Sequence, residues 1–189
     1  MRWQQLFDDL QSQFEAEEAA AERVESASRT RAEVGGIRLV ERLGGALGTA
    51  VSLEVRGAGR VSGVLMDGGA DWLLLADDQG MDHLVALAAV RSVAGLGRLT
   101  APPGPPDAVR ARLDLRWALR GLTRDRAPVQ VVLDDGGTVT GTLDRVGADY
   151  VELAEHPSDA PRRSEAVRGV RAVVIGAVAL VRTVPPALG

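Results

Sequence analysis

The sequence lacks several residue types, and each absence limits what the protein can do. It has no cysteine, which excludes disulfides, thiolate chemistry and zinc sites built on four thiolates. It has no lysine and no asparagine, and its 22 basic residues are all arginine. The 26 acidic residues outnumber the basic ones, which argues against a protein whose main role is to coat nucleic acid.

Long apolar runs are also absent. The longest, residues 172–181, lies between Arg171 and Arg182 and is much shorter than the ~20 residues that a membrane-spanning helix needs. Residues 1–9 lack the uninterrupted apolar core of a signal peptide. We therefore expect a cytoplasmic protein that has no membrane partner.

The most informative feature that is present is an internal repeat. Residues 51–76 align with residues 129–154 without a gap, so that every residue lies 78 positions from its twin. Gly63 and Gly141 coincide in mid-strand, where a strongly bent sheet leaves no room for a side chain. The repeat predicts two copies of one small β module. Its most distinctive coincidence is a quartet of glycine, alanine, aspartate and an aromatic residue at 69–72 and 147–150.

Within each copy the apolar residues alternate with a period of two, which is typical of β-strands. In the first copy this pattern predicts strands at 51–55, 61–65 and 72–76. A fourth and a fifth strand follow within 84–93, separated by a tight corner. The second copy closes in the same way at 173–181, after a connection that is ten residues longer.

Helical periodicity precedes both copies. Residues 3–33 carry apolar residues at intervals of three and four, which predicts an amphipathic helix, and 37–47 predicts a shorter one. The stretch 100–106 contains four prolines and is expected to be a stiff linker. After it, Asp107 can cap a helix that runs to about Leu122.

The order of these elements resembles a known family. The order is a helix, a strand, an Asp-Gly hairpin, a strand ending in Gly-x-Leu and a strand of the form Asp-aromatic-x-x-Leu. This order is similar to the first motif of the Sm-like fold, the small barrel of Sm proteins and of the bacterial Sm-like RNA chaperone. In the second copy the motif consists of residues 129–133, 135–136, 141–143 and 149–153, and 173–181 takes the place of the second motif.

The resemblance implies a mainly β protein with helices, of the α+β class. Two tandem Sm-like or SH3-like five-stranded barrels, each preceded by a helix, would follow a long N-terminal amphipathic helix. The expected domains are the N-terminal helix at 1–34, the first barrel with its leading helix at 37–99, the proline-rich linker at 100–106 and the second barrel with its leading helix at 107–184.

The residues with which that family holds RNA are not matched. The family's turn carries an asparagine, whereas this chain has Gly-Ala-Asp at 69–71 and 147–149. The Arg-Gly pair of the second motif is replaced by Leu87-Ala88 and Ile175-Gly176. We therefore expect a non-enzymatic protein-interaction or scaffold protein, with an Sm-like RNA-binding protein as the alternative.

No group of residues predicts catalysis, a cofactor or a metal. His83 and His156 do not occupy equivalent positions of the repeat, and we expect both in loops or at the surface. The spacing of the turn aspartates matches no EF-hand loop, so solvated turns explain them better than calcium does. These aspartates are Asp67, Asp71, Asp77, Asp78 and Asp82.

Two groups of residues are candidates for binding a partner. An aromatic stripe on the N-terminal helix either packs on this chain or docks on another protein or a second copy. Four arginines spaced by four form a ridge on the second helix, and this ridge either meets acids of the same chain, binds phosphates or an acidic partner, or is solvated. The stripe consists of Trp3, Phe7, Leu10 and Phe14, and the ridge of Arg112, Arg116, Arg120 and Arg124.

Overall fold

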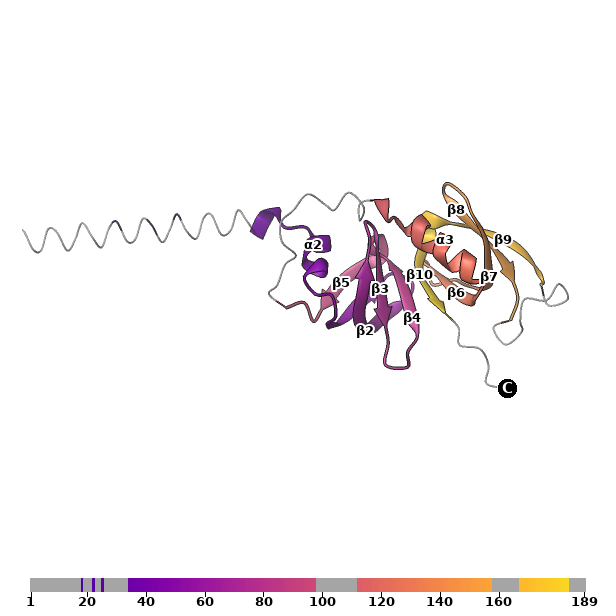
Figure 1. Ribbon diagram of the computed structural model, residues 1–189, viewed down its shortest axis with the longest axis horizontal. Helices are drawn as coiled ribbons and strands as arrows, with labels where there is room; N and C mark the ends of the chain where they lie inside the picture. Colours follow the sequence, from indigo (N-terminus) through magenta and orange to yellow (C-terminus); the bar gives the residue numbers. More distant parts are fainter. Residues whose placement is uncertain are drawn as a thin grey trace, which may run out of the picture. The chain divides into compact units, whose positions relative to one another are not determined.

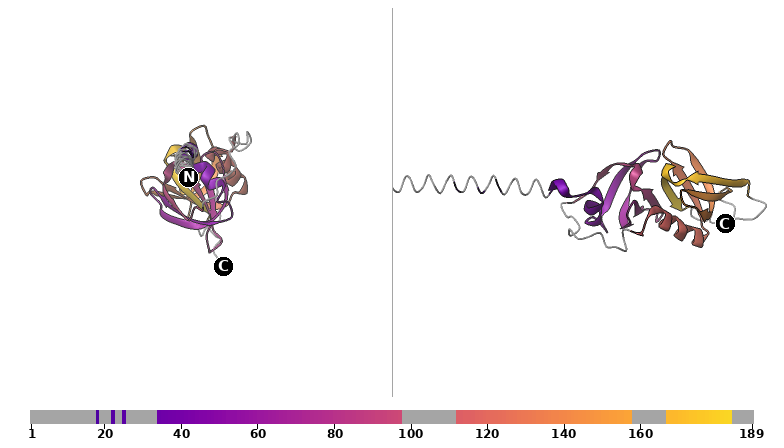
Figure 2. Two further views of the ribbon diagram at one scale, coloured as in Figure 1. Left: turned by 90° about the vertical axis from the view of Figure 1, so that its left-hand side faces the viewer. Right: turned by 90° about the horizontal axis from the view of Figure 1, so that it is seen from above.

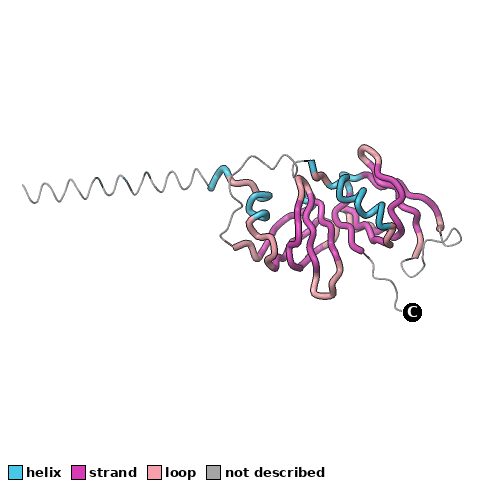
Figure 3. Tube along the Cα trace, in the orientation of Figure 1, coloured by secondary structure: helices cyan, strands magenta, loops and turns pink. Residues whose placement is uncertain are grey.

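The computed structural model describes Glu18, Glu22, Glu25 and residues 34–97, 112–157 and 167–183. The chain divides into two units, residues 1–39 and residues 40–189. Nearly all of the described residues belong to the second unit, and strands make up most of it (Figure 3). We call residues 40–97 the first half of this unit, and residues 112–157 with 167–183 the second half.

The first half is a short helix followed by five strands. Its strands alternate buried and exposed side chains, as the period of two in the sequence predicts, and a single turn of 3-10 helix separates the last two strands. The elements are α2 (Leu39–Gly44), β1 (Ala50–Val55), β2 (Gly59–Gly68), β3 (Trp72–Ala76), β4 (Asp82–Ala86), η1 (Leu87–Ala89) and β5 (Val90–Ala94).

The second half repeats this order. Its helix is longer and packs against β7. The elements are α3 (Leu115–Asp125), β6 (Pro128–Leu133), β7 (Thr138–Val146), β8 (Tyr150–Glu155), β9 (Gly169–Val174), η3 (Ile175–Ala177) and β10 (Val178–Thr183). Asp107, which was predicted to cap this helix, lies outside the described residues. The N-cap of α3 is Asp114, whose carboxylate accepts from the backbone N–H of Trp117 at 2.8 Å.

The ten strands within the described residues form one antiparallel sheet (Figure 1). Its order is β5-β1-β2-β3-β4-β10-β6-β7-β8-β9, so that five neighbouring strands come from each half. Figure 2 shows the two groups of strands from two further directions. Because β4 pairs with β10, the sheet continues from one half into the other, and β5 and β9 are its two open edges.

This architecture corrects the predicted fold. We expected two separate small barrels and a long N-terminal helix, but the described residues form one large open sheet with little helix. Closing the first half on itself would require β4 to pair with β5, and β4 instead pairs with β10 of the second half. Of the described α-helices, α3 alone is longer than six residues. The predicted helix at 1–34 lies mostly outside the described residues.

Equivalent positions of the repeat build equivalent parts of the core. Leu53, Leu65 and Leu75 are at most 1% exposed. Their twins in the second half are buried to the same extent, and each such side chain contributes roughly 1.5–3 kcal/mol through its removal from water. These twins are Val131, Leu143 and Leu153.

The two mid-strand glycines lie where neighbouring backbone comes closest. A Cβ on Gly63 would overlap the carbonyl oxygen of Ala76, and one on Gly141 would overlap that of Ala154. In both halves the strand pairing shifts register soon after the glycine, between Leu65 and Asp67 in β2 and at the equivalent place in β7. The glycines therefore permit the bend that the sequence predicted.

In the described part of the chain, none of the helices combines the length and the apolar character that a membrane crossing requires.

Candidate functional site at the joint between the two halves

The two halves meet in one strand pair, which we call the joint. Strand β10 runs antiparallel to β4, with Val181 opposite Leu84 and Arg182 opposite His83. Leu84 is 5% exposed and Val181 only 1%. The joint is therefore continuous with the hydrophobic core, and it ends at the polar residues Arg182 and His83.

A close turn contact accompanies the strand pair. Gly57, in the turn between β1 and β2, has a φ of 76°, and a Cβ there would overlap the carbonyl oxygen of Leu133. Glycine is thus required at this position for two reasons, its backbone conformation and the nearby carbonyl. Beside it, Arg56 Nη1 lies 3.6 Å from Asp134 Oδ2, and both side chains are partly exposed, so this ion pair adds little stability.

The start of α3 docks on the quartet at 69–72 of the first half. The carbonyl oxygen of Leu113 accepts from the backbone N–H of Ala70 at 3.0 Å and from Nε1 of Trp72 at 2.8 Å. The indole of Trp117 stacks on that of Trp72, with ring centroids 6.4 Å apart. The segment that leads into the second half is therefore held by the first half.

Asp71 of the same quartet completes this docking. Its Oδ1 accepts from the backbone N–H of Leu115 at 2.7 Å, at the first residue of α3. Partial burial of the carboxyl raises the pKa of Asp71, and the negative charge of nearby Asp114 adds to this increase. The hydrogen bond from Leu115 acts in the opposite direction.

The twin quartet at 147–150 is more open. Gly69 and Trp72 are buried, whereas Gly147 and Tyr150 are only half-buried. Arg116 Nη1 donates to the carbonyl oxygen of Ala148 at 2.9 Å. The second half thus presents a less covered copy of the surface on which α3 docks in the first half.

At the polar end of the joint, His83 forms a buried pair with Asp77. Nε2 of His83 lies 2.9 Å from Oδ2 of Asp77, and His83 is 6% exposed. Hydrogen bonding from His83, together with the backbone N–H of Met81, lowers the pKa of Asp77. The repeat places Glu155 and Arg171 at the equivalent positions, and they form an exposed ion pair of 2.6 Å in the second half.

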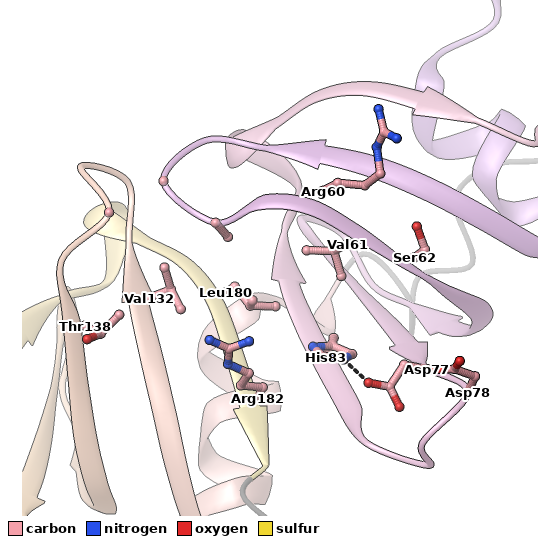
Figure 4. Close-up of a pocket in the computed structure, with 13 residues that line it drawn as sticks. Arg60, Val61, Ser62, Asp77, Asp78, His83, Val132, Thr138, Leu180 and Arg182 are labelled. Atoms are coloured by element: carbon pink, nitrogen blue, oxygen red, sulfur yellow. Dashed lines mark hydrogen bonds and ion pairs between the residues drawn. The ribbon is translucent and has the colours of Figure 1, made fainter.

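A cavity of about 340 Å³ opens beside this pair (Figure 4). Residues of both halves line it, so it exists only because the joint forms. Its lining from β2, the β3–β4 hairpin, β6, the β6–β7 hairpin and β10 includes Ser62, Asp77, His83, Val132, Thr138 and Arg182.

The residues that the sequence nominated for partner binding do not gather at one place in the described structure. The aromatic stripe of Trp3, Phe7, Leu10 and Phe14 lies outside the described residues. Within the arginine ridge, Arg112 precedes α3, whereas Arg120 and Arg124 are exposed on the helix. Arg116 is bound within the chain, to Ala148 as described and to Asp114 Oδ2 through Nε at 3.2 Å.

Both histidines were predicted at the surface or in loops. His156 does lie in the loop directly after β8, but both histidines are buried rather than exposed. His156 is 3% exposed and its Nε2 lies 2.8 Å from Oγ1 of Thr142, while Nδ1 lies 2.9 Å from the carbonyl oxygen of Pro157. The joint buries His83, which sequence reasoning could not foresee because β10 is about a hundred residues away. The alternation of β4, in which His83 falls on the same side as Val85, was the available signal.

No three histidine, aspartate or glutamate side chains of the described residues come together in a way that could hold a metal ion. Comparison of the chain with protein-family models, with curated proteins and with solved structures found no match.

Proposed function

We propose that this protein is a non-enzymatic scaffold that joins protein chains through the open edges of its sheet, beginning with copies of itself. The joint between β4 and β10 is the observation that carries this proposal. An open edge offers a row of backbone donors and acceptors to another strand. Edge strand β9 also exposes Val170 and Val174, at 64% and 61%.

The repeat makes the two open edges complementary. Strand β9 is the equivalent of β4 and β5 is the equivalent of β10, each 88 positions away, so a second copy can bring its β5 to β9 as β10 comes to β4. Val181 lies opposite Leu84 in the joint. The same register between two copies places Val93 of one opposite Ala172 of the other.

Backbone directions agree with this register. The N–H of Leu87, just after β4, donates to the carbonyl oxygen of Asp71, just before β3, at 2.9 Å. Because N–H groups alternate in direction along a strand, the N–H of Leu84 points away from β3 and toward β10. In the second half the N–H of Ile175 donates to Asp149 at 2.8 Å. By the same alternation Ala172 turns its N–H outward, to the open edge.

The open quartet at 147–150 supplies a second contact for the same copy. In the first half the equivalent quartet holds the segment before α3, with Trp117 stacked on it. Leu39 lies 78 positions before Trp117, and it is 44% exposed. We propose that Leu39 of a second copy docks on this open quartet.

One position makes the contact between copies weaker than the joint. Asp135 stands at the position equivalent to Gly57, where the joint has no room for a Cβ. The facing turn of a second copy must therefore lie farther from Asp135 than Leu133 lies from Gly57. We expect reversible association between copies and a permanent joint within each chain.

Proline at the outward N–H of either edge tests the proposal. Ala172→Pro removes the outward donor of β9 and Val93→Pro removes that of β5, and proline on an edge costs no hydrogen bond within the sheet. Each variant alone should be monomeric by sedimentation or light scattering at concentrations where the native protein associates. An equimolar mixture should form a dimer and nothing larger, because each variant keeps the edge that the other has lost.

The matched controls keep the N–H at the same positions. Ala172→Val and Val93→Ile should associate like the native protein, and Asp135→Gly should associate more strongly. A native protein that stays monomeric at all concentrations would refute association between copies. Association that survives in both proline variants would place the contact elsewhere on the chain.

A further inference from the structure

The cavity at the joint has a polar wall that the fold alone does not explain. Asp77 and His83 close the β3–β4 hairpin, as Glu155 and Arg171 close the equivalent hairpin of the second half. That role accounts for Nε2 of His83. It leaves Nδ1 of the same imidazole, which is buried and has no hydrogen-bond partner among the described residues.

A second polar group beside the imidazole lacks a partner of opposite charge. Arg182 lies opposite His83 across the joint and donates from Nε to the amide oxygen of Gln130 at 2.7 Å. Within the described parts of the chain, no carboxylate forms an ion pair with its guanidinium. Figure 4 shows the imidazole with Asp77 on one side and Arg182 on the other.

The other charged groups of the lining do not pair with the guanidinium of Arg182 or with Nδ1 of His83. The Asp77 carboxylate already accepts from the backbone N–H groups of Gln79 and Met81 as well as from His83. Asp78 lies beyond Asp77 from the imidazole (Figure 4). Arg60 is engaged with Glu54 Oε1 at 2.8 Å.

The unsatisfied groups define the ligand. A carboxylate can only accept, so the bond to Asp77 places the proton of the neutral imidazole on Nε2 and leaves Nδ1 as an acceptor. The guanidinium of Arg182 can only donate and favours an oxyanion. A ligand that satisfies both needs acidic oxygens and one remaining O–H, which hydrogen phosphate and singly protonated phosphate monoesters have and sulfate and carboxylates lack.

We propose that the cavity between the halves binds a phosphate group, with Arg182 holding its charge and Nδ1 of His83 accepting from its hydroxyl. Thr138 and Ser62 also line this cavity, and the Ser62 hydroxyl is hydrogen-bonded to that of Ser52 at 2.8 Å. This site does not involve the open edges of the sheet, so the phosphate site and the scaffold function can be tested separately.

The two histidines allow a direct test on the native full-length chain. Nitrogen-15 imidazole spectra near neutral pH, recorded with sodium phosphate and with sodium chloride at matched ionic strength, report both rings separately. Phosphate should shift the Nδ1 signal of His83 and leave His156 unchanged, because both nitrogens of His156 already have partners. Sodium sulfate should bind roughly two- to tenfold more weakly, since it offers no O–H to Nδ1.

A pair of arginine variants tests the charged half of the site. Arg182→Gln should weaken phosphate binding by about tenfold or more, the loss expected for a hydrogen bond to a charged group. Arg145→Gln is the matched control, because Arg145 is exposed and pairs with Glu152 away from the cavity. Titration with glycerol phosphate beside inorganic phosphate shows whether the site prefers the free ion or a phosphorylated small molecule.

Two outcomes would overturn the site. One is a native spectrum in which phosphate leaves the His83 signals unmoved, and the other is equal binding of phosphate by the native protein and Arg182→Gln. The native spectrum decides the question even if Arg182→Gln does not fold.

Discussion

Gly141 is the position where the smallest added group should have the largest effect on the sheet. It pairs with Glu155 across β7 and β8, and an alanine Cβ there would overlap the carbonyl oxygen of Ala154 and lie 2.9 Å from its carbon. That separation is about 0.6 Å less than the ~3.5 Å at which two carbon atoms attract each other. The obstructing atoms belong to backbone, so a side-chain rotation cannot relieve the overlap.

Gly141→Ala should therefore lower the free energy of unfolding by about 1 to 3 kcal/mol, the usual cost of overpacking. The roughly 0.5–1 kcal/mol that alanine otherwise gains over glycine within a strand offsets part of this strain but does not exceed it. In a chain of this length the loss corresponds to a decrease in Tm of roughly 2 to 12 °C. Urea unfolding followed by circular dichroism measures it.

Gly121→Ala is the matched control. Gly121 lies in α3 with nothing within 4 Å of a Cβ, so alanine there should stabilise the protein by about 0.8–1 kcal/mol through its helix propensity. Gly63→Ala, at the equivalent place in β2, should destabilise like Gly141→Ala. If Gly141→Ala were as stable as the native protein, the close approach of β7 and β8 would be wrong, and with it the bend of the sheet.

Two further substitutions test buried polar contacts. His83 holds the pKa of Asp77 below its usual value, so Asp77 stabilises the fold above pH ~3.8 and loses this contribution as the pH falls through its lowered pKa. The difference in urea midpoint between native protein and Asp77→Asn should thus shrink steadily in acid, and a constant difference would show that the carboxylate charge is not involved. Thr142→Val should cost about 1–3 kcal/mol, because Nε2 of His156 loses its partner within the core. Urea unfolding measures this too, and an unchanged midpoint would mean that the hydroxyl does not satisfy the imidazole.

How much of the joint could be predicted from sequence differs between its parts. The quartets at 69–72 and 147–150 stand out as a repeat, but their unequal burial does not, because it depends on α3 docking at one and not at the other. The pair of Asp77 and His83 is six residues apart across a hairpin and was within reach of local reasoning. Arg182 could not be placed beside it, since it comes from the far end of the chain.

The sequence by itself determined where the strands run and that the chain repeats. Side-chain alternation, turn glycines and the quartets are local signals, and they identified the strands of both copies and the two glycines at the bends. The tertiary structure alone decided which edges pair. Backbone donors and acceptors are the same in every strand, so no residue pattern states that β4 meets β10 rather than β5. That single pairing turns two expected barrels into one open sheet, buries His83, and creates both the cavity and the two free edges.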